Sequence, residues 1–226
     1  MVIFNFTLMF QNKNSFIRLV INNMSVHRSY AGETQILQEI DTTKDKNLLI
    51  PLTKVVSFSS KEVRTKWCKQ LLCKLHIIHS EFSDAKCNIC LDNLKVDRNS
   101  NLVLTDVFEK STYDAKLITD VEFKAPELLN CDKTSKPGDV WAAGICVYYV
   151  INLSFPWQVA DERDENFRLW KCEGKFSSTV ESWLVKMLAR MLCVDPVVRA
   201  NTEEALEHLW DDKTEEAVLS KFYLTS

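Results

Sequence analysis

The sequence predicts an α+β fold in which a small lobe that contains strands precedes a larger, mainly helical lobe. Strand-like apolar segments come first in the chain, and segments with apolar residues at helical spacing follow them. The 226 residues are 46% hydrophobic and 26% charged, which is the balance of an ordinary globular domain. A chain of this size buries enough surface to be stable without disulfides or a structural metal.

Residues 1–56 are expected to form the small lobe. Residues 2–10 and 16–22 have the composition of strands, and residues 30–41 carry apolar side chains on one helical face. Residues 48–52 are expected to form one more short strand. The small lobe is thus predicted to hold a few strands and one helix.

Residues 57–210 are expected to form the large lobe. Apolar side chains at helical spacing predict a helix from Glu62 to His79, and a β-hairpin follows, with its second strand at residues 101–105. Residues 139–153 are apolar on nearly all sides of a helix, which is typical of a helix at the centre of a domain.

Two further helices are marked by their first residues. Ser178-Thr179-Val180-Glu181 has the pattern of a capping box and predicts that a helix begins there. Asn201, with Glu204 three residues later, predicts the start of the last core helix. Residues 211–226 are expected to form a charged tail.

Charge and apolar content exclude two kinds of partner. The 28 Lys and Arg residues against 31 Asp and Glu residues supply no phosphate-neutralising face, so no nucleic-acid partner is expected. The longest apolar stretch, near residues 145–151, is too short to span a bilayer, so no membrane partner is expected. Several of the eight cysteines sit in apolar helical patterns, which favours a reducing compartment, the cytoplasm or the nucleus.

Four motifs resemble the large lobe of protein kinases and occur in that family's order. They are residues 99–106, Ala125-Pro126-Glu127, residues 139–144 and residues 195–199. The resemblance covers about residues 30–210, and it implies a protein-kinase-like fold with a reduced N-terminal β lobe. The segment after Phe155-Pro156-Trp157 faintly resembles the small SH3-binding kinase group.

The resemblance assigns candidate catalytic residues by position. Asp106 falls on the metal-binding aspartate, and Asn93, thirteen residues earlier, falls on the asparagine that holds the second magnesium ion. Asn88 falls where the family has the aspartate that accepts the substrate's proton, and an amide cannot replace that base. A gapped alternative places Asp92 at the base and Asn99 at the asparagine, but it shortens the hairpin.

The front of the domain departs further from the family pattern. Glu33 matches the glutamate of the family's αC helix, but Leu19 stands where its partner lysine is expected. Between Val56 and Glu62 there is no room for the fifth strand, hinge and following helix, so the backbone that binds adenine is expected to be deleted. In an active kinase, Glu33, Asn93 and Asp106 would bind the cofactor ATP, with magnesium held by Asn93 and Asp106, and the expectation here is that no cofactor is bound.

Three charged residues are expected to have structural roles. The resemblance implies that Glu127 pairs with Arg199, and that Asp139 anchors the backbone of the catalytic loop. Since each lies beside apolar residues inside a family motif, the three together predict an intact large lobe.

A different chemistry is open at two pairs of residues. His76 and His79, followed by Cys87 and Cys90, have a spacing that could hold zinc, and the two cysteines could also form a redox pair. Against this, side chains three residues apart on an apolar helical face are usually core.

The predicted function is that of a pseudokinase which binds another protein, such as a kinase, as its allosteric regulator or inhibitor. The alternative is an active or weakly active ATP-dependent serine/threonine kinase. A third reading is a truncated product, such as a splice form, without a stable fold.

Overall fold

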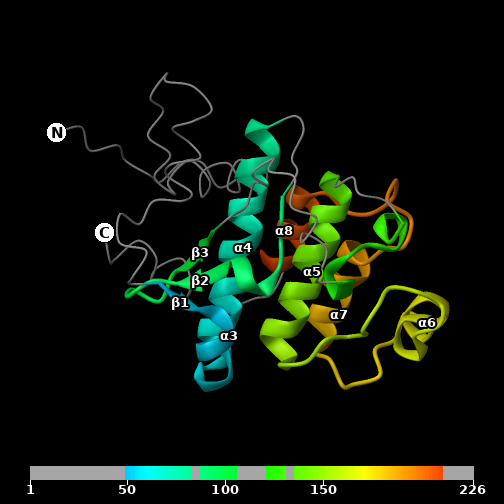
Figure 1. The fold of residues 1–226 in the computed structure, drawn as a ribbon, viewed down its shortest axis with the longest axis horizontal. Coiled ribbons are helices and arrows are strands. Elements are labelled where there is room, and N and C mark those ends of the chain that lie inside the picture. The colour runs from blue at the N-terminus through cyan, green and yellow to red at the C-terminus, as the bar shows by residue number, and fades with distance from the viewer. Residues whose placement is uncertain (1–48, 83–86, 106–120, 131–134, 211–226) are drawn as a thin grey trace. The chain divides into compact units, whose positions relative to one another are not determined.

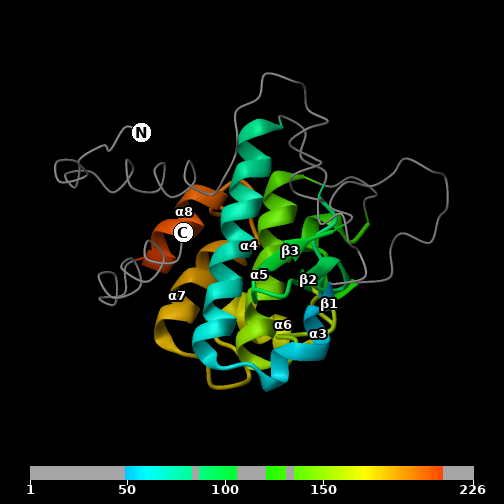
Figure 2. The same ribbon diagram turned by 90° about the vertical axis from the view of Figure 1, so that its left-hand side faces the viewer.

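Two long helices, α4 (Lys61–Glu81) and α5 (Lys136–Asn152), lie side by side through the part of the protein that the structure describes (Figures 1 and 2). The computed structural model describes residues 49–82, 87–105, 121–130 and 135–210, which all fall within one unit, Thr43–Ser226. The other elements, in chain order, are β1 (Ile50–Pro51), α3 (Leu52–Val55), η2 (Val56–Phe58), η3 (Leu91–Asn93), β2 (Leu94–Val96), β3 (Leu102–Leu104), η4 (Val121–Phe123), η5 (Pro126–Leu128), α6 (Glu165–Glu173), α7 (Ser182–Met191) and α8 (Thr202–Trp210).

Both long helices begin at side-chain caps. The hydroxyl of Ser60 accepts a hydrogen bond from the N–H of Val63 at the start of α4, and Ser135 does the same for Gly138 at the start of α5. Pro137 fits the first turn of α5 because its missing N–H would have no partner there. The two predicted helices are confirmed, and α5 begins three residues earlier than expected.

Helices α7 and α8 complete the core. Helix α8 packs on α4 and α7, and α7 packs on α5, so that the central helix α5 is buried on nearly every side. The predicted capping box of α8 is confirmed: Asn201 N–H donates to Glu204 at 3.1 Å, and Glu204 N–H donates to the Asn201 side chain at 3.0 Å. Among the described residues, no helix is both long and apolar enough to cross a membrane.

The capping box predicted at Ser178 is wrong. Helix α7 begins only at Ser182, and its N-terminal residue Glu181 makes no capping hydrogen bond. The hydroxyl of Ser178 instead lies 2.6 Å from the hydroxyl of Tyr148 on α5, and Glu181 accepts a hydrogen bond from Lys61. Tertiary partners have taken both side chains that would have capped the helix.

The sheet has three antiparallel strands in the order β1-β2-β3. In the predicted hairpin, which is confirmed, Leu94 pairs with Leu104 and Val96 with Leu102. The strand predicted at residues 48–52 is present only at Ile50–Pro51, because Leu52 already begins α3.

Helix α3 corrects one part of the expectation about this region. A helix was expected to be deleted before Glu62, but α3 and η2 occupy residues 52–58 directly before α4. The expected deletion of the fifth strand and hinge stays a prediction, since such elements would belong before Leu49, outside the described residues. The strands predicted at residues 2–10 and 16–22, the helix at residues 30–41 and the tail lie outside them as well.

Candidate functional site

The loop between α4 and β2 places the two candidate asparagines together. Asn93 ends the short helix η3, and its side-chain N–H donates to the main-chain oxygen of Asn88 at 2.9 Å. The main-chain oxygen of Asn93 accepts the N–H of Thr105 at 2.9 Å and lies 3.3 Å from the Thr105 hydroxyl. Positions 88, 93 and 105 are thus joined at one point, and Asp106, which follows Thr105, lies outside the described residues.

These contacts favour the ungapped assignment of the catalytic loop. Asn93 reaches back five residues to Asn88, which carries an amide where the family has a carboxylate. Asp92, the base in the gapped alternative, is exposed, and its main-chain oxygen accepts a hydrogen bond from Lys95 at 2.6 Å. At position 88, five residues before Asn93, the loop therefore carries an amide where the family has the carboxylate that accepts the substrate's proton.

Asp139 lies in the first turn of α5 and is only 2% exposed. Its carboxylate lies 3.0 Å from Nε2 of His79 on α4. Burial raises the pKa of Asp139, while hydrogen bonds from His79 and from the side chain and backbone of Cys87 act in the opposite direction. Since Cys87 immediately precedes Asn88, Asp139 reaches the backbone of the loop, as the resemblance implies.

Arg199 joins three parts of the lobe. Its guanidinium donates two hydrogen bonds to the carboxylate of Glu127, at 2.6 and 2.9 Å, and its side chain has 0% exposure. The same group donates to the main-chain oxygens of Pro137 and Cys193, and it lies 4.9 Å from the ring centre of Trp141. The ion pair implied by the resemblance is present, and it links the segment before α5 to the end of α7.

The four residues of the zinc alternative do not form one cluster. Nδ1 of His76 lies 3.0 Å from the hydroxyl of Thr202 on α8, and burial lowers the pKa of His76. His79 and Cys87 are instead grouped with Asp139, with one donor atom of each within 4.8 Å of the others. Sequence reasoning missed Asp139 as a member of this cluster.

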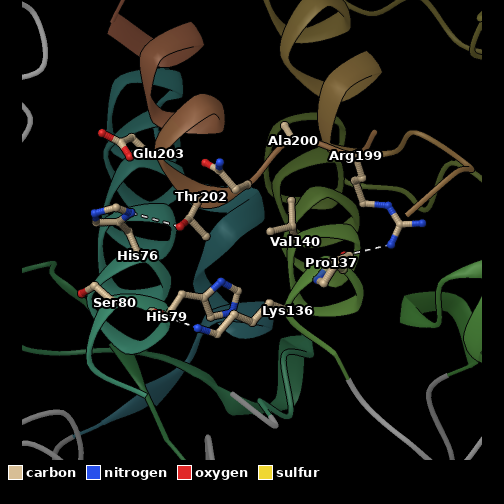
Figure 3. Close-up of a pocket in the computed structure, with 11 residues that line it drawn as sticks. His76, His79, Ser80, Lys136, Pro137, Val140, Arg199, Ala200, Thr202 and Glu203 are labelled. Carbon is tan, nitrogen blue, oxygen red and sulfur yellow. Dashed lines mark hydrogen bonds between the residues drawn. The ribbon is translucent and has the colours of Figure 1, made fainter. Parts of the chain in front are cut away.

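A pocket of about 250 Å³ opens between α4, α5 and the start of α8 (Figure 3). His76 and His79 lie on one side of it, and Lys136 and Thr202 on others. The ammonium group of Lys136 donates to the main-chain oxygen of His79 at 2.7 Å. Neither candidate asparagine lines this pocket, but His76 and His79 of the zinc alternative do, as does Arg199.

The described residues do not by themselves make a magnesium site. Of the two metal candidates, Asp106 lies outside the described residues, as does the cofactor-binding candidate Glu33, and Asn93 alone can be placed. The amide nitrogen of Asn93 is bonded to Asn88, which leaves one neutral oxygen, whereas magnesium is usually held through carboxylates.

Gln70 is a positioning residue that sequence reasoning missed. Its side-chain oxygen accepts the N–H of Leu102 at 2.7 Å, and its nitrogen donates to Asn101 at 3.1 Å. These bonds fix β3, which leads directly to Asp106, against α4. The available signal was a polar residue among apolar ones on the buried face of a helix.

The helices around α5, the hairpin and the loop at Asn88 define a chain built like the large lobe of a protein kinase. The protein kinase domain matches residues 12–211, which is most of the sequence. The chain belongs to the protein kinase family. The predicted α+β fold class and the family resemblance are confirmed.

Similar proteins include several serine/threonine kinases. The probable serine/threonine-protein kinase MARK-B of Dictyostelium discoideum is 28% identical over 165 residues, which cover 69% of this chain and 23% of that protein. A calcium and calcium/calmodulin-dependent serine/threonine-protein kinase of Oryza sativa subsp. japonica is 27% identical over 150 residues, or 62% of this chain and 28% of that protein. The SNF-related serine/threonine-protein kinase of Homo sapiens is 27% identical over 144 residues, which cover 61% of this chain and 18% of that protein. The chain spans less than a third of the length of these relatives.

Proposed function

We propose that this protein is a pseudokinase of the serine/threonine-kinase type, which acts by binding another protein and not by transferring phosphate. The observation that carries the proposal is the side-chain amide of Asn88 at the position of the base, on a residue whose main-chain oxygen accepts a hydrogen bond from Asn93. An amide does not take up a proton near neutral pH, so a substrate hydroxyl would lose its general base.

The structural residues of the lobe support the same function. The Arg199–Glu127 ion pair and the buried Asp139 tie segments of the large lobe together through contacts between the protein's own residues. A lobe that retains its scaffold while it lacks the base is suited to recognition, since phosphoryl transfer needs several groups acting together. We propose that the partner is a protein, such as another kinase, whose activity is raised or inhibited by binding.

A phosphoryl-transfer assay tests the loss of catalysis. The wild-type protein, Asn88→Asp and Asp106→Ala are incubated with radiolabelled ATP, magnesium and a mixture of serine- and threonine-containing peptides. We expect the wild type to transfer no more phosphate than Asp106→Ala. Transfer by the wild type above that control would replace the proposal by its alternative, an active serine/threonine kinase. Two observations favour this alternative: the presence of α3 before α4, and the curated serine/threonine kinases among the relatives.

A second experiment tests the binding function. Tagged wild-type protein and the destabilised control Arg199→Ala are recovered from the same cells, and the proteins that accompany each are compared by mass spectrometry. We expect a kinase to accompany the wild type and to be absent from the control. If every accompanying protein is shared with the control, the binding function is wrong.

A further inference from the structure

His79, Cys87 and Asp139 come from three separate segments and meet at one buried point. His79 belongs to the last turn of α4, Cys87 precedes the catalytic-loop position Asn88, and Asp139 belongs to the first turn of α5. One nitrogen, one sulfur and one oxygen donor lie within 4.8 Å of one another. The roles predicted for Arg199–Glu127 as an ion pair and for Asp139 as an anchor of the loop backbone need neither the thiol of Cys87 nor the imidazole of His79.

We propose that His79, Cys87 and Asp139 bind a zinc ion, with water as its fourth ligand. Imidazole nitrogen, thiolate sulfur and carboxylate oxygen are the three kinds of donor that zinc takes in proteins. Three protein ligands and one open position are typical of zinc sites that exchange a ligand, whereas closed structural sites use four. The proposal is independent of whether the protein transfers phosphate.

The distances are compatible with a tetrahedral ion. Bonds of about 2.0–2.3 Å place neighbouring ligand atoms roughly 3.4–3.6 Å apart. His79 and Asp139 are 3.0 Å apart in the structure, and all three donors lie within 4.8 Å. The side chains therefore have to move by only on the order of 1 Å to enclose the ion.

Charge also balances at this buried point. A divalent ion bound to one thiolate, one carboxylate and one neutral imidazole gives a complex without net charge, which suits a site where the Asp139 side chain is almost wholly buried. Zinc takes the place of the thiol proton of Cys87, which leaves to solvent. Burial and the neighbouring Asp139 carboxylate raise the pKa of Cys87 in the metal-free protein. Lys136, whose ammonium donates to the main-chain oxygen of His79, acts on that thiol in the opposite direction while it opposes the incoming cation.

The pocket gives the ion a route of entry. His79 belongs both to the cluster and to the lining of the pocket, and its side chain keeps 8% exposure. In Figure 3 its ring lies at the side of the pocket between α4 and α5, with Lys136 next to it. An ion that enters the pocket thus meets His79 as its first ligand.

Two spectroscopic measurements on the wild-type full chain test the proposal. Cobalt titration is expected to give, at one ion per chain, a sulfur-to-cobalt charge-transfer band and the intense visible bands of a tetrahedral ion. X-ray absorption of the zinc-loaded protein is expected to show one sulfur at about 2.3 Å and the remaining ligands at about 2.0–2.1 Å. A count of two or more sulfur ligands, or of none, would overturn the proposed site, and this result comes from the wild-type protein and does not depend on any substitution.

Matched variants identify the ligands. Cys87→Ser is expected to abolish the charge-transfer band and to weaken cobalt binding at least tenfold. Cys73→Ser is the control, because Cys73 is equally buried, at 4% exposure for both thiols, and lies outside the cluster. His79→Gln is expected to weaken binding while the sulfur band persists at high cobalt. A band that survives in Cys87→Ser, or disappears in Cys73→Ser, would assign the metal to another site.

Discussion

Arg199 shows how one side chain can hold several segments of a lobe together. A planar guanidinium offers five donors in a fixed geometry, and here they are directed at a carboxylate and at main-chain oxygens. Those acceptors belong to η5, to the first turn of α5 and to the segment after α7. The bidentate contact with Glu127 adds geometric specificity, since two parallel hydrogen bonds fix the orientation of both groups.

Arg199→Ala is expected to lower the free energy of unfolding by about 3–5 kcal/mol, because it leaves a buried pair with one partner and frees several main-chain acceptors. Urea denaturation followed by circular dichroism measures this loss. The control is Arg163→Ala, since the side chain of Arg163 is 88% exposed and pairs with Asp161 at the surface. Equal stability of the two variants would contradict the role given to Arg199.

Single residues were predictable where the family resemblance supplied their positions. The resemblance placed Asn88 and Asn93 five residues apart in one loop, and the structure joins them by a hydrogen bond. The cluster at His79 was predicted with the wrong members, because its contact to Asp139 joins residues 60 apart in the sequence. His76, one helical turn before His79, faces α8 instead, and only the packing of the helices determines this.

Helix ends show the limit of local patterns at the scale of the element. The patterns at Ser178 and at Asn201 both match a capping box, yet only Asn201 and Glu204 form one. Ser178 and Glu181 are drawn away by Tyr148 and Lys61, which lie far away in the sequence. A capping pattern is therefore decisive only when no tertiary partner competes for its side chains.

The start of α6 gives a pH-dependent prediction. Burial alone would raise the pKa of Asp164, but the N–H groups of Gln158, Val159, Asn166 and Phe167 donate to its carboxylate and hold the pKa below its ordinary value of 3.8. Because the folded-state pKa is lowered, the stabilisation is present above 3.8 and is lost as pH falls through the folded-state pKa.

Asp164→Ala is expected to lower the free energy of unfolding by about 1 kcal/mol at neutral pH, and the difference from wild type should shrink in acid. Denaturation curves at pH 7, 4 and 2.5 measure it. Glu165→Ala is the control, since Glu165 is exposed and does not cap the helix. A difference that stays constant over this range would mean that Asp164 acts by packing and not by its charge.

At the scale of the molecule, apolar periodicity predicted the helices α4, α5 and α7, whereas α6 was not predicted. In α4, α5 and α7, the apolar residues that recur at helical spacing in the sequence include most of the residues that are buried in the structure. The boundary between β1 and α3 was not predictable, because an apolar run around a proline fits the end of a strand and the start of a helix equally well. The domain boundaries at residues 56 and 210 remain predictions.

Magnesium ATP is expected to leave the melting temperature of the whole protein unchanged. A ligand at one hundred times its Kd would stabilise the folded state by about 2.7 kcal/mol, which a thermal melt detects readily. The melt is run with and without nucleotide on the wild type and on Asp106→Ala. An upward shift in the wild type that is absent from Asp106→Ala would show that a nucleotide site is present.

The hydrogen bond from Asn93 to position 88 ends on a main-chain oxygen, and every amino acid supplies that oxygen. A change of side chain at position 88 therefore leaves the acceptor of this bond in place. Asn88→Asp alters the chemistry that the loop presents without removing its tie to Asn93, whereas Asn93→Ala removes the tie and leaves the side chain at position 88 unchanged.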